Sequence, residues 1–310
     1  MDYAKNLLVK TCELYYNLGM NQQEISKRLD ISRVKVSRLL TEAKQKGIVN
    51  IEILYPPDNC IDLEKKVEEK YGIEESVIIA SEGKSEDLIF AEVTKIAAEY
   101  MGEKINKTDW IGLAWGRTIK SMVSKLADDK SAEKVVQLLG NIGSSEYSGD
   151  VIVRGVAANM KSEANLLSAP AIVDNEAIKK AIISDGSIRQ VLELQKQCNI
   201  AFVGIGLTDE TSTLAQAGYL KTEDIENLKK AKALGEVCGW FIDGDGNICD
   251  TPLKDRVIGI HHEDLRKIPH VVAIGTGEKK AEAMDAILKS KLVDVLITDE
   301  KTVQAMLDRN

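Results

Sequence analysis

The chain has 310 residues, of which 44% are apolar, 29% charged and 5% aromatic. This composition is typical of a globular chain with a sizeable core, in about two domains, and it excludes a collagen-like or wholly disordered protein. The longest uncharged, apolar-leaning run, Cys198 to Thr208, is too short to cross a membrane, and the N-terminus lacks a signal-peptide pattern. We therefore expect a cytoplasmic protein with no membrane partner. The five cysteines form no C-x-x-C pair, which predicts reduced structural thiols, no metal site and no cofactor.

Charge is distributed unevenly along the chain, although the net charge is −8. Residues 1–50 hold nine basic and five acidic residues, a net charge of +4, and the rest of the chain carries −12. A basic segment joined to an acidic body suits a protein whose basic part meets phosphate while its body repels it. Any contact with nucleic acid is therefore expected within residues 1–50.

Residues 1–46 carry the pattern of three helices separated by tight turns. Apolar residues recur with a helical period from Tyr3 until Gly19, which is placed to end the first helix. Asn21 and Glu24 have the spacing of a capping box at the start of a second helix. Ser32 is placed to cap a third helix that runs to about residue 46. Two short helices joined in this way predict a helix-turn-helix.

A strand and a domain boundary are expected next. Residues 48–55 alternate between apolar and polar side chains, which predicts a strand, and Pro56 and Pro57 interrupt that pattern. A strand directly after a helix-turn-helix predicts a β wing, which is frequent in DNA-binding domains. We therefore predict a winged helix-turn-helix domain over residues 1–55 and a second domain over residues 56–310.

The third helix carries the candidate DNA contacts. In a helix-turn-helix the first turns of the second helix enter the major groove. Arg33, Lys35 and Ser37 are expected to face the DNA, with Arg33 and Lys35 reading bases, while Arg38 and Lys44 meet the backbone. The alternative is that these side chains merely solvate an ordinary helix, and the expected wing favours DNA binding. The complete set of candidate DNA-binding residues is Gln22, Ser32, Arg33, Lys35, Ser37, Arg38 and Lys44.

The second domain alternates short apolar runs with helical patterns, after an amphipathic helix at residues 61–71. Continuous apolar strands between helices predict a Rossmann-like α/β domain with a mainly parallel sheet that is covered on both faces. The expected strands are residues 77–80, 110–114, 135–139, 200–205, 257–260, 271–274 and 293–298. The expected helices are residues 85–104, 117–127, 150–162, 174–197, 210–233, 278–290 and 299–308.

Candidate anion-binding residues follow several of these strands. In an open parallel sheet, ligands bind beyond the C-terminal ends of the strands, where helix N-termini present N–H groups. Glycine after a strand is often only part of a turn, so the convergence of several such segments at one edge of the sheet favours a phosphate site. The candidate effector-binding residues are Gly116, Arg117, Thr118, Gly140, Asn141, Gly206, Thr208, Asp243, Gly275, Thr276, Gly277 and Lys280. Residues 243–247 resemble the start of a calcium loop, but the later ligand positions are wrong and a turn is expected there.

Segments along nearly the whole chain resemble the bacterial sugar-binding transcriptional regulators of the sorbitol-operon regulator (SorC) family. They are Leu14-Tyr15-Tyr16, Asn21 to Ile25, Ile31-Ser32-Arg33 with Val36 to Leu40, Gly112 to Thr118, Val203 to Gly206, Phe241-Ile242-Asp243 with Gly246, Gly275-Thr276-Gly277 with Lys280, and Leu296 to Glu300. The resemblance implies a winged head that binds operator DNA, joined to a domain for effector binding and oligomerisation. It implies a fold similar to glucosamine-6-phosphate deaminase and ribose-5-phosphate isomerase, a phosphorylated sugar or polyol as effector, and a dimer or tetramer.

One departure from the family pattern and one rival function bear on this hypothesis. In the deoxyribonucleoside branch a lysine follows the Val-Val-Gln-Leu stretch, whereas this chain has Leu139, so the resemblance implies neither an imine nor deoxyribose phosphate here. The rival is a sugar-phosphate isomerase or deaminase-like enzyme with a fused DNA-binding head. Such chemistry needs a positioned base and acid, and no such pair stands out. The sequence therefore favours a regulator of a carbohydrate catabolic operon over an enzyme, and leaves open whether it represses or activates.

Overall fold

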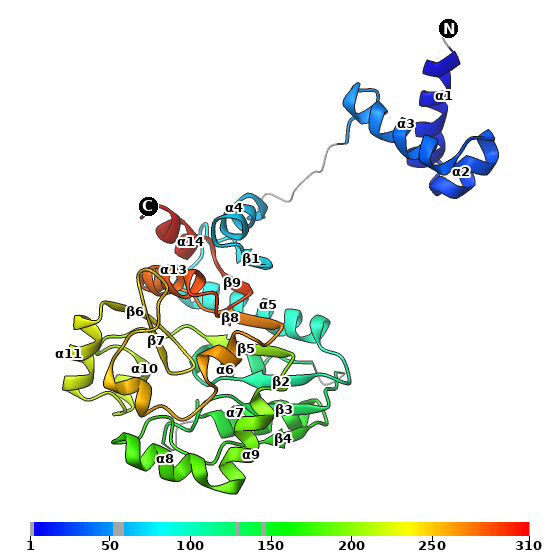
Figure 1. Ribbon diagram of the computed structural model, residues 1–310. Coiled ribbons are helices and arrows are strands. Elements are labelled where there is room, and N and C mark those ends of the chain that lie inside the picture. Colours follow the sequence, from blue (N-terminus) through cyan, green and yellow to red (C-terminus); the bar gives the residue numbers. More distant parts are fainter. Residues whose placement is uncertain (1–2, 52–58, 128–129, 144–146, 310) are drawn as a thin grey trace. The chain divides into compact units, whose positions relative to one another are not determined.

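The computed structural model describes residues 3–51, 59–127, 130–143 and 147–309. The chain divides into two compact units, residues 1–57 and residues 58–310. Figure 1 shows the helices and strands of each unit. In the described ranges, no helix combines the length and the apolar character that are needed to cross a membrane.

The N-terminal unit contains the three predicted helical segments. They are α1 (Tyr3–Cys12), which continues as a π-helical turn, η1 (Glu13–Asn17), then α2 (Gln22–Leu29) and α3 (Arg33–Gln45). Both halves of the predicted capping box are present, because the Asn21 side chain accepts from the Glu24 N–H and the Glu24 carboxylate accepts from the Asn21 N–H. Ser32 caps α3 by accepting from the Lys35 N–H at 3.2 Å. The helix-turn-helix prediction is confirmed.

The start of the predicted wing strand takes a different conformation. The N–H groups of Ile48 and Val49 donate to the Ala43 carbonyl of α3, at 2.9 and 3.3 Å, after a left-handed Gly47. The segment therefore closes the end of α3 instead of pairing with a strand, and residues 48–51 are not a strand. The remainder of the predicted strand, residues 52–55, lies outside the described residues.

A seven-stranded parallel sheet forms the centre of the second unit, in the order β1-β9-β8-β5-β2-β3-β4. In chain order these strands are β1 (Glu75–Ile79), β2 (Trp110–Leu113), β3 (Lys134–Gln137), β4 (Glu163–Asn165), β5 (Ile200–Gly204), β8 (His270–Ile274) and β9 (Val295–Asp299). Most of these strands were predicted from their apolar runs, and the Rossmann-like fold class is confirmed.

Helices connect the strands and cover the sheet (Figure 1). They are α4 (Ile61–Tyr71), α5 (Glu86–Lys104), α6 (Arg117–Val123), α7 (Gly149–Asn159), α8 (Glu176–Ser184), α9 (Gly186–Gln195), α10 (Thr213–Gln216), α11 (Thr222–Lys230), α12 (His262–Leu265), α13 (Ala281–Lys289) and α14 (Glu300–Leu307), with short 3-10 helices η2 (Pro252–Asp255) and η3 (Glu278–Lys280). The predicted helix 174–197 is divided into α8 and α9 because Asp185 has an extended backbone and its carboxylate caps α9 at the Ser187 N–H.

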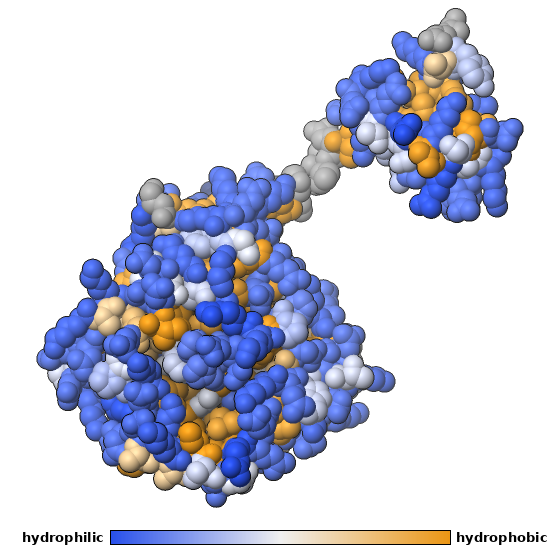
Figure 2. All heavy atoms as spheres, viewed as in Figure 1, coloured by the Kyte–Doolittle hydropathy of each residue, from blue (hydrophilic) through white to orange (hydrophobic). Residues whose placement is uncertain are grey.

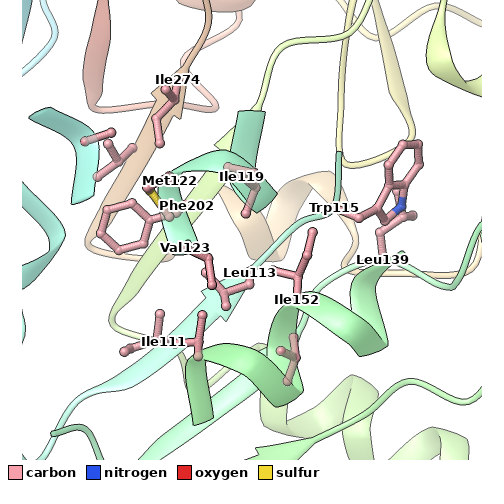
Figure 3. Packing of buried hydrophobic residues seen from close by; sticks show 14 of the residues in the cluster. Ile111, Leu113, Trp115, Ile119, Met122, Val123, Leu139, Ile152, Phe202 and Ile274 are labelled. Atoms are coloured by element: carbon pink, nitrogen blue, oxygen red, sulfur yellow. The ribbon is translucent and has the colours of Figure 1, made fainter. Parts of the chain in front are cut away.

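The core consists of two apolar layers, one on each face of the sheet. Successive residues of β5 alternate between the layers, with Phe202 in one layer and Val203 in the other. Figure 3 shows the first layer, in which Ile111 and Leu113 of β2 lie with Ile119 and Met122 of α6. Burial on both faces explains why the central strands are continuous apolar runs. The outer surface seen in Figure 2 is mostly hydrophilic.

Two predicted elements of the second unit are wrong. Residues 257–260 form single antiparallel bridges instead of a strand of the main sheet, at Val257 to Ile172 and Gly259 to Leu139. The predicted helix 210–233 is replaced by α10 and α11, and its last residue begins the hairpin of β6 (Ala233–Val237) and β7 (Trp240–Asp243). That hairpin turns at Cys238 and Gly239, which both have positive φ angles. Cysteine in this conformation is not a turn signal that a sequence pattern would reveal.

Candidate functional site

A cavity of about 600 Å³ opens beyond the C-terminal ends of β2 and β5. Its walls come from the β2–α6 turn, the segment after β5, α10, the end of β6 and the loop after β8. Among the residues that line it are Phe90, Trp115, Gly116, Arg117, Thr118, Leu139, Ile142, Gly206, Ser212, Gln216, Glu236, Cys238, Thr276 and Lys280. The strand ends that the sequence singles out therefore meet around one space, as expected for an open parallel sheet.

The β2–α6 turn brings Arg117 to this cavity. Gly116 has φ +122°, a conformation that L side chains rarely adopt, and this lets the chain turn sharply into α6. Arg117 is the first residue of α6, and its guanidinium lies 4.6 Å from the centre of the Phe90 ring. This stacking orients an exposed cation at the mouth of the cavity while leaving its N–H groups available in the plane of the guanidinium.

Lys280 supplies a second cation from the loop after β8. Its Nζ donates to the Ile205 carbonyl at 2.7 Å, which holds the amine against the end of β5. Burial, and then the positive charge of Arg117, lower the pKa of Lys280 to about 8, while Glu236 acts in the opposite direction. An ammonium has three N–H donors, so a ligand can still be bound through the others.

Glu236 is a charged cavity residue that is not among the predicted effector-binding residues. The side chain is 8% exposed, and its carboxylate accepts from the Gly239 N–H at the hairpin turn. Burial raises its pKa to about 7, against the opposing effects of the Gly239 N–H and Lys280. A Cβ at position 206 would lie 2.2 Å from Glu236 Oε2, so Gly206 makes room for this carboxyl group. The signal in the sequence is a single acid within the run from Ala233 to Val237, which becomes informative once the hairpin is known.

Of the loop of Gly275, Thr276 and Gly277, Thr276 lines the cavity. The Gly275 N–H donates to the Ile297 carbonyl at 3.2 Å, and the Gly277 N–H donates to Thr302 Oγ1 at 2.8 Å. Both groups are therefore engaged within the protein.

Three further residues that the sequence predicts to bind the effector lie outside the cavity wall and make contacts within the protein instead. Asn141 Oδ1 accepts from Gln137 Nε2, Ser148 Oγ and the Asp150 N–H, at 2.8, 3.1 and 3.2 Å. Beside it, Gly140 is in close contact with backbone, since a Cβ there would lie 2.5 Å from the Pro170 oxygen. Thr208 Oγ1 donates to the Ala233 carbonyl at 2.9 Å.

Asp243 also lies outside the residues that line the cavity. Its carboxylate accepts from the N–H groups of Asp245 and Asn247, at 3.0 and 2.9 Å, and so closes the turn after β7. This is the turn that the sequence predicts in preference to a calcium loop. Across the described residues, no group of three or more His, Cys, Asp or Glu side chains is placed to hold a metal ion.

The predicted DNA-binding residues surround the exposed side of α3. The buried face of α3 contains Val36, Leu39, Leu40 and Ala43. The helical period places Arg33, Ser37 and Lys44 along one flank of this face and Lys35 along the other, and all four are exposed. Gln22 is half-buried at the start of α2, and Ser32 is exposed at the cap of α3.

A helix-turn-helix unit joined in one chain to an α/β domain with a charged, ligand-sized cavity defines a ligand-responsive transcriptional regulator. Residues 55–308 match the family described as "Putative sugar-binding domain", and the chain belongs to this family. It is 33% identical to the deoxyribonucleoside regulator of Bacillus subtilis (strain 168), over 99% of both chains.

Solved structures agree with this assignment. The full-length sorbitol operon regulator SorC of Klebsiella pneumoniae is 28% identical, with a TM-score of 0.75 over 97% of this chain and 98% of that chain. A DeoR family transcriptional regulator from Listeria monocytogenes is 30% identical, with a TM-score of 0.75 over 79% of this chain and 98% of that chain. The predicted SorC-type family is confirmed, and the comparisons favour a transcriptional regulator over the isomerase or deaminase alternative.

Proposed function

We propose that this protein binds operator DNA through its N-terminal unit and that a phosphorylated sugar or polyol in the cavity of the second unit controls that binding. The regulated genes then belong to a carbohydrate catabolic operon. The observation that carries the proposal is the pairing of two cations, Arg117 and Lys280, with one buried acid, Glu236, around a single cavity.

The two cations suit a phosphate group. Arg117 offers a planar fork of N–H donors, and Lys280 offers a point charge whose Nζ is fixed by the Ile205 carbonyl. Because the pKa of Lys280 is about 8, the amine is mostly protonated at neutral pH, and a bound dianion raises that pKa further. Binding of the phosphate therefore strengthens the charge that holds it.

The buried acid suits the hydroxyl groups of the same ligand. A carboxylate accepts hydrogen bonds from sugar hydroxyls, whereas it repels phosphate, so Glu236 orients the ligand with its phosphate toward Arg117 and Lys280. Leu139 lines the cavity and has no amine, so no imine forms at this position. This supports non-covalent binding of the effector beside Leu139. It disfavours the imine through which the deoxyribonucleoside branch of the family would hold deoxyribose phosphate.

The DNA-binding set is carried by α3 and the turn before it. The exposed cations Arg33, Lys35, Arg38 and Lys44 bind the major groove and its backbone, and Gln22, Ser32 and Ser37 add polar contacts. One such unit contacts too little DNA for typical specific affinity, so two or more copies act together on symmetric half-sites. We therefore propose a dimer or tetramer, and light scattering that finds a monomer both with and without operator contradicts this.

A thermal-shift screen of the full-length protein against sugars and their phosphates tests the effector. A ligand at 100 times its dissociation constant stabilises the protein by about 2.7 kcal/mol, so a specific effector is readily detected. The expected result is stabilisation by one or a few sugar or polyol phosphates, which also change the binding of DNA selected by the protein. Equal stabilisation by the unphosphorylated parent contradicts the phosphate assignment.

A further inference from the structure

The outermost face of α3 combines an apolar side chain with a cation. Val36, Leu39, Leu40 and Ala43 point into the core of the unit. A period of 3.6 residues then places Val34 and Arg38 almost opposite that buried face, one turn apart, with Thr41 as the next residue on the same line. All three are exposed, as is Gln45 at the end of the same line, so this line faces away from the core of the unit.

Val34 takes no part in the apolar core of the N-terminal unit. It is 63% exposed, unlike the buried valine and leucines of the same helix. Valine is also a weaker helix former than alanine, so an exposed valine in the first turn does not stabilise α3. Its neighbours Arg33 and Lys35 are exposed cations, so Val34 is a single apolar side chain among exposed basic ones.

The major groove contains one apolar group that suits such a patch. Thymine presents its C5-methyl group there, and apolar side chains read it by contact. Guanine presents O6 and N7, which an arginine binds bidentately. Residues at i and i+4 lie one helical turn apart, close to the separation of neighbouring or next-neighbouring base pairs. The two side chains can therefore read two nearby positions of one half-site.

We propose that Val34 and Arg38 read bases, with Val34 packed on a thymine methyl group and Arg38 bound to a guanine within two base pairs of it. The inference rests on the proposed function, because it requires that α3 enters the major groove. It moves Arg38 from the backbone contacts that the sequence predicts to the face of α3 that reads bases. Lys44, on the flank, stays a backbone contact.

The first experiment selects duplexes from a random-sequence DNA pool with the full-length wild type and with Val34→Ala. The wild type is expected to enrich a half-site that contains a guanine with a thymine within two base pairs. Val34→Ala, which lacks the two γ-methyl groups, is expected to show a weaker preference for that thymine and to keep the guanine. The same motif from both proteins, with the thymine equally preferred, overturns the assignment of Val34.

The second experiment changes single atoms of the DNA. Replacing the thymine with uracil removes the methyl group and is expected to weaken wild-type binding about fourfold, the factor for one buried methyl group. Replacing the guanine with 7-deazaguanine removes N7 and is expected to weaken wild-type binding at least about fivefold. The loss on the first change is then smaller for Val34→Ala than for the wild type, and the loss on the second is smaller for Arg38→Ala, as a double-mutant cycle requires. Losses in the variants equal to those of the wild type overturn the proposal.

Two controls separate this inference from folding and from the proposed function. Val34→Thr keeps the branched shape and one methyl group, so it is expected to retain most of the uracil effect, and circular dichroism should show the wild-type melting temperature for Val34→Ala. A wild type that enriches no motif at all contradicts the proposed DNA-binding function. A motif that is enriched while Val34→Ala and Arg38→Ala respond normally to the modified bases contradicts only the present assignment.

Discussion

The two units of the chain differ in how far the charged residues of their candidate sites are buried. On α3, Arg33, Lys35 and Arg38 are exposed to solvent. In the cavity, Glu236 is buried, and burial lowers the pKa of Lys280 to about 8. Exposed charges act over a distance but are screened by salt, whereas buried charges are screened much less and are sensitive to protonation. Operator affinity should therefore depend mainly on the salt concentration, and the charges of the cavity residues should depend mainly on the pH.

The largest expected effect is the salt dependence of operator binding. If paired N-terminal units make at least six phosphate contacts, operator affinity falls at least about a thousandfold between 50 and 200 mM salt. Effector affinity depends on one partly buried cation, Lys280, and one exposed cation, Arg117, and is expected to fall by less than about tenfold over the same range. Fluorescence anisotropy with operator and calorimetry with effector, both in potassium chloride, measure the two slopes. Slopes of equal size would show that the two sites do not differ in the way described.

A change in pH tests the buried acid. The pKa of Glu236 is about 7 in the folded protein and about 4.5 in the unfolded chain, so between these values the folded state holds a proton that the unfolded state has released. The contribution of this group to the free energy of unfolding is therefore largest below pH 4.5 and falls by a few kcal/mol as the pH rises to 7.

Glu236→Gln replaces the titratable carboxyl group with an amide. The free energy of unfolding of this variant should therefore fall less between pH 4.5 and pH 7 than that of the wild type. Urea denaturation of the wild type and the variant at several pH values between 4.5 and 7 measures the difference. Parallel curves for the two proteins mean that Glu236 titrates normally and that its burial has been misjudged.

The next effect concerns a residue that the sequence assigned to the ligand. Asn141→Ala leaves Ser148 Oγ and the Asp150 N–H without their acceptor, so the free energy of unfolding should drop by about 1–3 kcal/mol. Asn165→Ala is a matched control, since that side chain makes one long hydrogen bond, 3.4 Å, to the Glu163 carbonyl. Chemical denaturation gives both values. An Asn141→Ala variant with unchanged stability and weakened effector binding would show that Asn141 contributes to effector binding.

On the N-terminal unit, Arg33→Ala is expected to cost about 1–3 kcal/mol of operator binding and to relax specificity at one position. Lys44→Ala provides the contrast, because loss of a backbone contact weakens binding to all sequences alike and lowers the salt slope by about one. Titrations with the operator and with single-base variants distinguish the two patterns. Uniform weakening by Arg33→Ala would make it a backbone contact.

The fold was predictable from the sequence wherever the sequence signal lies within a single helix or strand. The capping residues Asn21 and Ser32 and the buried strands of the sheet are local or periodic patterns, and the structure confirms them. The hairpin of β6 and β7 was missed because its turn uses a left-handed Cys238, which has no characteristic sequence signal. The wing strand was partly mispredicted because Ile48 and Val49 pair with the end of α3.

The location of the candidate site was predictable from the sequence, but the contacts made by its individual residues were not. The strand-end rule brought Gly116, Arg117 and Lys280 together correctly. It could not show that the Gly277 N–H donates to Thr302, a residue of α14 that lies beyond α13 and β9 in the chain. Nor could it show that Glu236 enters the cavity, because its direction is set by a hairpin that packs against distant segments. Contacts between elements, which a single sequence does not display, decide these points.

The central claim is that a phosphate bound by Arg117 and Lys280 controls a DNA contact made elsewhere in the chain. The most direct test titrates the wild type, Arg117→Ala and Lys280→Ala, each bound to operator, with the phosphorylated sugar and with its neutral parent. Hydrogen bonds to charged groups contribute about 1.5–3 kcal/mol, so each variant should need at least about ten times more phosphorylated sugar, while operator affinity without effector stays within about twofold. A normal response of both variants, or a neutral sugar that acts as strongly as its phosphate, would contradict the account.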